Sequence, residues 1–110
     1  MKKAGLIRCM QTEDYCPAST CLANAKTGEG GYAEFGPVEI VAVNTCGGCP
    51  GKKAISRALE MKKRGCEVIV LGSCILKGTP ASISYACPFG NKIKQLIEEK
   101  TGLPVISWTH

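Results

Sequence analysis

Four short runs of apolar and β-branched residues alternate with stretches of helical periodicity along this chain of 110 residues. Each run is bounded by polar residues, glycine or proline, as strands usually are. The runs cover 4–9, 38–45, 67–71 and 104–107. Apolar residues at helical spacing predict helices over 51–64 and 89–100, and a proline and a glycine delimit a shorter helix within 16–28. This β-α-β-α-β-α-β order predicts an α/β fold in which a parallel sheet carries helices on both faces.

The order of elements also predicts the architecture. We expect a three-layer sandwich around a four-stranded parallel sheet with the flavodoxin-like order 2-1-3-4, because that order creates a switch point early in the chain. Pro50 suits the first position of the second helix, and Gly65 suits the position just past its end. The glycine-rich stretch 28–31 is typical of a loop. A chain of this length matches a single domain over residues 1–110.

Several classes of partner are disfavoured by composition. The longest apolar stretch, 68–76, falls far short of the roughly 18 apolar residues that a membrane span needs, and Arg8 and the acidic residues after it interrupt any signal-peptide core. The net charge is +5, but aromatic residues make up only 5% of the chain, too few to stack many bases. The clustered cations, Arg57 among them, fall on the predicted solvent face of helix 51–64. We therefore expect no membrane partner and no nucleic-acid partner.

Eight cysteines are the main functional feature of the sequence. Disulfide-rich domains are usually secreted, whereas this chain has the pattern of a regular α/β domain, so we expect a cytoplasmic protein with reduced or metal-bound thiols. Ligands of open parallel sheets bind beyond the carboxyl ends of the strands. The residues at that edge are Cys9, Cys16, Cys46, Cys49, Cys74, Cys87 and His110. Cys21 and Cys66 fall elsewhere and are interpreted as small buried or surface thiols.

The motif Cys46-Gly47-Gly48-Cys49 lies where the second strand turns into the second helix. The C-x-x-C spacing lets two sulfurs chelate one ion or close a small disulfide ring, and the glycines permit positive φ. A helix start directs backbone N–H groups at the sulfurs, which stabilises thiolate over thiol. The thiolate is the form that binds metal or attacks a disulfide. A single C-x-x-C is consistent with both kinds of chemistry.

Metal binding is the favoured hypothesis, because thiolates bind both zinc and iron–sulfur clusters, and the pattern does not choose between them. The first four ligands would be Cys9, Cys46, Cys49 and Cys74. A fourth-ligand substitute, or a second centre, would come from Cys87, Cys16 or His110. The alternative is a thiol–disulfide or sulfur-transfer enzyme that uses the C-x-x-C thiols. Anion binding by the glycine loop is a weaker third hypothesis, because its spacing does not match the P-loop.

The chain also resembles a known family over essentially its whole length. The motifs that carry the resemblance are Arg8-Cys9, Thr12-Glu13-Asp14 with Cys16-Pro17, Gly36-Pro37, Cys46 to Lys53, Gly72-Ser73-Cys74, Cys87-Pro88 and Thr109-His110. Together they resemble the CGGC-domain family of bacteria and archaea. The resemblance implies a small metal-binding domain, with zinc as the suggested metal and no particular reaction. It points to the same six cysteines and to His110, and because this is the one histidine, we expect a mostly thiolate site.

Overall fold

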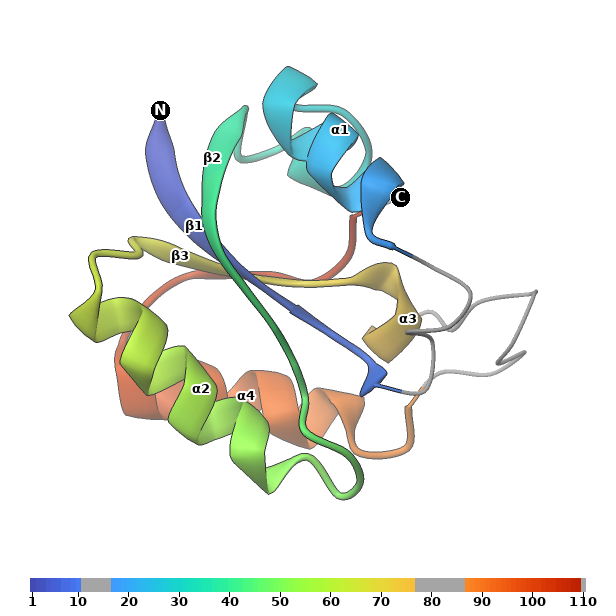
Figure 1. Ribbon diagram of the computed structural model, residues 1–110, viewed down its shortest axis with the longest axis vertical. Helices are drawn as coiled ribbons and strands as arrows, with labels where there is room; N and C mark the ends of the chain where they lie inside the picture. Colours follow the sequence, from blue (N-terminus) through green and yellow to red (C-terminus); the bar gives the residue numbers. More distant parts are fainter. Residues whose placement is uncertain (11–16, 77–86, 110) are drawn as a thin grey trace.

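The computed structural model describes residues 1–10, 17–76 and 87–109. Its elements are, in chain order, β1 (Lys2–Arg8), α1 (Ser19–Thr27), η2 (Gly30–Tyr32), β2 (Val38–Thr45), α2 (Lys52–Lys63), β3 (Val68–Leu71), α3 (Ser73–Leu76), α4 (Gly90–Thr101) and β4 (Val105–Ile106). The four strands form one sheet in the order β2-β1-β3-β4, and each neighbouring pair is parallel. The predicted α/β fold and the order 2-1-3-4 are therefore confirmed (Figure 1).

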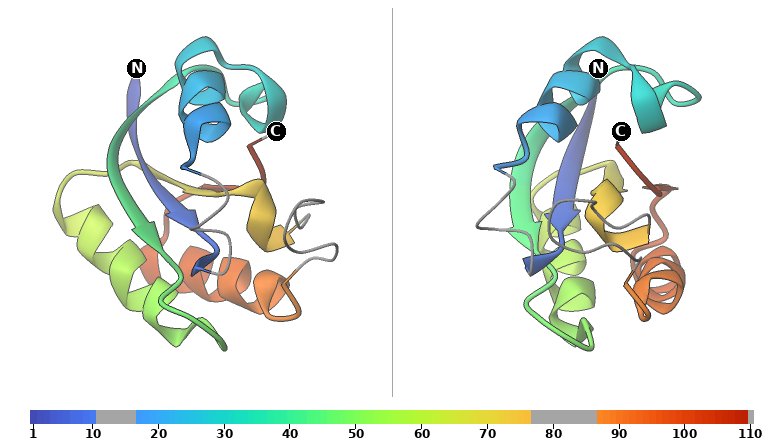
Figure 2. Two further views of the ribbon diagram at one scale, coloured as in Figure 1. Left: turned by 45° about the vertical axis from the view of Figure 1, so that its right-hand side comes forward. Right: turned by 90° about the vertical axis from the view of Figure 1, so that its right-hand side faces the viewer.

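Helices cover both faces of this sheet. α1 and η2 lie on one face, whereas α2 and α4 lie side by side on the other (Figures 1 and 2). Successive residues of a strand point to opposite faces, so Leu6 packs in a core with Cys21 and Ala25 of α1, and Ile7 packs in a second core with Ala58 and other residues of α2 and α4. β3 is buried throughout, as expected of a parallel strand covered on both sides.

The start of α2 differs from the prediction. Pro50 does not occupy the first helical position, because the helix begins at Lys52 after Gly51, whose φ is 87°. Pro50 lies instead in a tight turn that the Gly51 N–H closes by donating to the Gly48 carbonyl at 2.8 Å. Gly48 has a φ of 97°, a conformation that glycine adopts at little cost. The chain must complete this turn before it can enter the helix.

The glycine-rich stretch after α1 is more ordered than the predicted loop. Gly30 to Tyr32 form the short 3₁₀ helix η2. A Cβ added at Gly31 would collide with the carbonyl oxygen of Trp108, so the backbone of η2 lies directly against the backbone of the C-terminal segment. Glycine is needed here for close approach between two backbones.

The C-terminal segment is held by a buried polar network. Thr109 is completely buried, and its Oγ1 lies 3.0 Å from Cys21 Sγ and 3.3 Å from Ser73 Oγ. Its N–H donates to Ser73 Oγ at 3.0 Å. Its carbonyl accepts hydrogen bonds from Asn24 Nδ2 at 2.9 Å and from the Gly31 N–H at 3.2 Å. One residue thus joins the end of the chain to α1, η2 and α3.

Two buried acidic groups make the fold less stable at alkaline pH. Tyr32 is completely buried and donates its hydroxyl to the Cys21 carbonyl at 3.1 Å. Burial, reinforced by the nearby Cys21 thiol, raises the pKa of the Tyr32 phenol, and burial also raises the pKa of the Cys66 thiol. Both groups therefore stay protonated in the folded protein at pH values where the unfolded chain ionises.

We expect the free energy of unfolding to fall as the pH rises above about 9, because the unfolded state then releases protons that the folded state retains. Urea titrations at pH values between 7 and 11 would measure this slope in the wild type and in the double variant Tyr32→Phe Cys66→Ala. The variant should lose about 1 kcal/mol at neutral pH through the missing hydrogen bond, yet show a shallower alkaline slope. An unchanged slope would show that Tyr32 and Cys66 do not cause the alkaline loss of stability.

Candidate functional site

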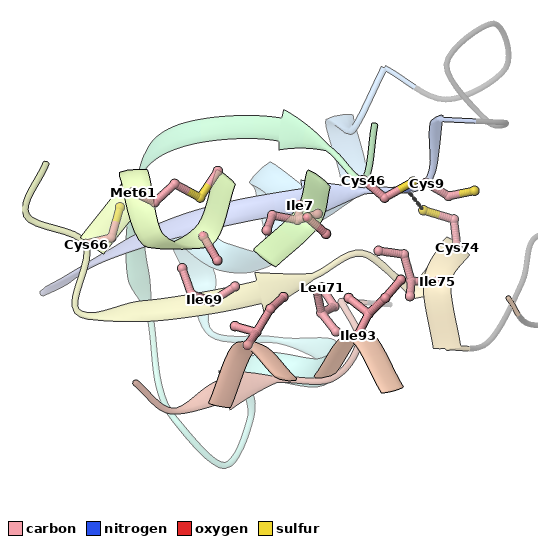
Figure 3. Close-up of a cluster of buried hydrophobic side chains, with 13 residues drawn as sticks. Ile7, Cys9, Cys46, Met61, Cys66, Ile69, Leu71, Cys74, Ile75 and Ile93 are labelled. Atoms are coloured by element: carbon pink, nitrogen blue, oxygen red, sulfur yellow. Dashed lines mark hydrogen bonds between the residues drawn. The ribbon is translucent and has the colours of Figure 1, made fainter. Parts of the chain in front are cut away.

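Three thiols meet at the carboxyl edge of the sheet. Cys9 follows β1, Cys46 follows β2, and Cys74 lies in α3 directly after β3 (Figure 3). Their side chains are buried, with exposed fractions of 7%, 8% and 7%. The Cys9 N–H donates to Cys74 Sγ at 3.2 Å, and the Cys46 N–H donates to the Arg8 carbonyl at 2.8 Å. Parallel pairing brings these distant segments together, because all carboxyl ends lie at one edge.

The three side chains point in different directions. In Figure 3 the sulfur of Cys9 points outward from the edge, away from the sulfur of Cys74. Within residues 1–10, 17–76 and 87–109, no three cysteine, histidine or acidic side chains converge in an arrangement that could hold a metal ion. The donor type at this edge fits zinc or an iron–sulfur cluster. Reorientation of side chains is needed to bring the donors to one point.

The CGGC loop separates the two thiols of its motif. Cys46 is buried, whereas Cys49 is exposed. Between them Gly47 and Gly48 have φ values of 77° and 97°, which residues with a Cβ rarely adopt. The two glycines thus let the chain turn sharply, so that one thiol faces the core and the other faces solvent.

Cys87 lies close to the same edge, in the turn before α4. It is half-buried and packs against the core that contains Cys46 and Cys74. Its N–H donates to the Ile75 carbonyl at 2.8 Å, which ties the turn to α3 one residue past Cys74. A fourth cysteine of the predicted set therefore packs against the core that contains the three central thiols.

The remaining cysteines fall into two groups. Cys21 and Cys66 are buried, with exposed fractions of 3% and 4%, and Cys66 lies beside Met61 at the opposite edge (Figure 3). Both fit the expected role of packed thiols. Cys16 and His110, which complete the predicted site, lie outside the described residues.

Arg57 holds the CGGC loop in place, a role that the sequence analysis missed. Its Nη1 donates to the Thr45 carbonyl at 2.9 Å and to Thr45 Oγ1 at 3.0 Å. Thr45 Oγ1 in turn accepts a hydrogen bond from the Gly47 N–H at 3.3 Å. Arg57 is half-buried, not simply solvated as predicted. Its position in the second turn of α2 was a usable signal, because helical side chains point back toward the N-terminus and so toward this loop.

Replacing Arg57 by Met should lower the free energy of unfolding by about 1–3 kcal/mol, because the carbonyl and the hydroxyl of Thr45 lose their donor. Arg64→Met is the matched control, since it removes the same charge from the residue that caps the end of the same helix. Arg64 is 76% exposed in its ion pair with Glu60, and such a pair contributes about 0.3–0.5 kcal/mol. Urea denaturation measures both variants. Equal losses would show that Arg57 does not support the loop.

None of the helices in the described part of the chain has the length and apolar character of a membrane span.

Comparisons with known proteins identify a matching family model and two related sequences. The family model of the CGGC domain matches residues 3–110. An uncharacterized protein of Methanocaldococcus jannaschii is 28% identical, over 98% of this chain and 86% of its own length. A second uncharacterized protein of the same organism is 32% identical, over 64% of this chain and 98% of its own length. No solved structure matches the chain significantly.

Proposed function

Because the chain belongs to the CGGC domain family, a cysteine-rich family, we propose that it binds zinc or an iron–sulfur cluster through thiolates at the carboxyl edge of its sheet. The observation that carries this proposal is the meeting of Cys9, Cys46 and Cys74 from three separate strand ends, each with an exposed fraction of 8% or less. Packing alone does not require three cysteines to gather at one edge of the sheet. Cys66 is equally buried but lies at the opposite edge of the sheet (Figure 3). Cys21 is equally buried but packs in the core on the other face of the sheet.

The chemistry of the donors supports the proposal. Thiolates are preferred ligands of zinc and of iron–sulfur clusters, and both centres take four protein ligands in their closed forms. Cys49 is the first choice for the fourth ligand, because only two glycines separate it from Cys46. Cys87, Cys16 and His110 are the other candidates. A bound zinc would cross-link the strand ends or act as a Lewis acid, and a cluster would exchange electrons.

Binding requires the side chains and the CGGC loop to move from their positions in the structure. The sulfur of Cys9 must turn toward Cys74, a rotation about one side-chain bond between staggered rotamers. Cys49 must turn inward, and the glycines at 47 and 48 allow the backbone to make that change with little steric cost. The hydrogen bonds of Arg57 to Thr45 anchor the end of β2 while the loop moves.

Thiol–disulfide chemistry is a second candidate, and one observation favours it. Within the C-x-x-C motif Cys49 is exposed and Cys46 is buried, which suits an attacking and a resolving thiol. The Cys49 thiolate would attack one sulfur of a substrate disulfide and expel the other as a thiolate. Cys46 would then attack the mixed disulfide, so that the substrate gains two electrons and the protein ends as a Cys46–Cys49 disulfide.

Anaerobic purification without chelator, followed by measurement of iron, sulfide and zinc per chain, tests the proposal. We expect a stoichiometric centre. Iron and sulfide with visible absorption would identify a cluster, and a colourless protein with zinc would identify a zinc site. A metal-free protein that retains reactive thiols would overturn metal binding. Formation of a Cys46–Cys49 disulfide with a model disulfide substrate would then support the second candidate.

A further inference from the structure

An apolar cavity opens at the surface beside the CGGC loop. It lies between the first turns of α2 and α4 and has a volume of about 210 Å³. The residues that line it include Pro50, Lys52, Ile55, Phe89, Lys92 and Leu96. The two helices touch at its base, because a Cβ added at Gly51 would collide with the Ile93 side chain. Phe89 is 39% exposed, so the cavity has an aromatic wall that is open to solvent.

Two lysines border this cavity. Lys52 and Lys92 are exposed, and each lies in the first turn of its helix. The helix dipole disfavours cations in that position, and neither first turn contains an acidic residue. Neither lysine belongs to an ion pair within the described residues. Their positive charge therefore does not stabilise the helices that carry it.

The acidic residues of both helices lie farther along. Glu60 is near the end of α2, and Glu98 and Glu99 are near the end of α4. Glu60 pairs with Arg64 at 3.1 Å, and Glu98 pairs with Lys94 at 3.8 Å. The first turns of the two helices thus form a positively charged surface around an apolar hollow.

We propose that this cavity docks a partner protein through one apolar side chain flanked by carboxylates. Its volume of about 210 Å³ is below the roughly 300–1,000 Å³ of small-molecule pockets, and it suits a single anchoring side chain of the kind that dominates protein interfaces. Carboxylates on either side of the anchor would complement Lys52 and Lys92 and steer the encounter. A nucleic acid would contact the two lysines but would not fill the apolar cavity.

The position of the cavity connects docking with the candidate centre. Pro50 lines the cavity and directly follows the exposed Cys49. A segment bound there lies one residue from Cys49, which is the exposed cysteine among those in the described part of the chain. This step rests on the proposed function: the docked partner would exchange metal or electrons with the centre through Cys49.

An NMR titration with a capped Glu-Glu-Leu-Glu-Glu peptide tests the proposal on the metal-free protein and on the protein as purified. We expect saturable shifts of the amides of Gly51, Ile55 and Ile93, with a dissociation constant of about 1 mM. Two matched peptides, one with lysines in place of the glutamates and one with serine in place of the leucine, should bind at least about fivefold more weakly. Absence of saturable shifts, or equal binding of the three peptides, overturns the proposal.

Charge-reversal variants locate the contact. The double variant Lys52→Glu Lys92→Glu should bind the acidic peptide at least about fivefold more weakly than the wild type does. Lys63→Glu Lys100→Glu makes the same change in net charge at the far ends of the same helices and should leave binding unchanged. Equal weakening in both double variants would show a non-specific charge effect and overturn the site.

Metal content separates this proposal from the one on which it rests. Both double variants should carry as much zinc or iron per chain as the wild type, because neither changes a cysteine. A protein that binds the peptide but holds no metal removes the metal centre and leaves the docking site. A protein that holds metal but shows no peptide contact removes the docking site and leaves the metal centre.

Discussion

Cys46→Ser should reduce the metal bound per chain to less than about a tenth of the wild-type value. Cys46 is one of the three thiols that meet at the carboxyl edge, and it belongs to the C-x-x-C motif as well, so its loss removes a ligand from every arrangement considered. A serine hydroxyl is a harder and poorer donor than a thiolate for zinc or for a cluster iron. Zinc, iron and sulfide measured after anaerobic purification give the result directly.

Cys66→Ser is the matched control for this experiment. It makes the same atomic change at a site that is equally buried, with an exposed fraction of 4% against 8% for Cys46, but it lies at the opposite edge of the sheet (Figure 3). It should retain the wild-type metal content. Thermal unfolding of both variants identifies any loss that comes from instability. Equal metal content in the wild type and both folded variants would rule out Cys46 as a metal ligand.

Gly31→Ala should lower the free energy of unfolding by about 2–4 kcal/mol. The new Cβ would collide with the carbonyl oxygen of Trp108, and this obstacle is backbone that no side-chain rotation can move aside. Relief requires η2 and the C-terminal segment to separate. That movement would break the hydrogen bond from the Gly31 N–H to the Thr109 carbonyl and disturb the buried network around it.

Gly5→Ala is the contrasting substitution. Its Cβ would collide with the Met61 side chain, which has several rotatable bonds and adapts readily, and would approach Cys66 Sγ at 3.3 Å. We expect a loss of about 1–2 kcal/mol, smaller than that of Gly31→Ala. Urea denaturation of the two variants tests the contrast between flexible and rigid obstacles. A smaller loss for Gly31→Ala than for Gly5→Ala would refute it.

The fold was largely predictable because its strands have simple local signals. The run 38–45 coincides with β2, and the alternation of strands and helices restricts the topology, since parallel crossovers are right-handed. η2 and α3 were not predicted, because elements of three and four residues are too short to show periodicity. The displaced start of α2 depends on the turn at Gly48, which sequence spacing does not specify.

The candidate site was predictable in its location but not in its geometry. Topology alone places Cys9, Cys46 and Cys74 at one edge, and the structure brings these three residues together there. The direction of each sulfur depends on rotamers, and the exposure of Cys49 depends on backbone angles at two glycines. The role of Arg57 was not predicted, because its contacts with Thr45 arise only when α2 packs against the end of β2.

The anchoring of Thr109 has a consequence for synthesis on the ribosome. This residue contacts α1, η2 and α3, so the layer formed by α1 and η2 is completed only by a residue that follows far later in the chain. Asn24 and Thr109 are separated by 85 positions, and at about 5–20 residues per second their synthesis takes between about 4 and 17 seconds. α1 and η2 spend that time without these contacts, so this layer reaches its native packing only after Thr109 has been synthesised.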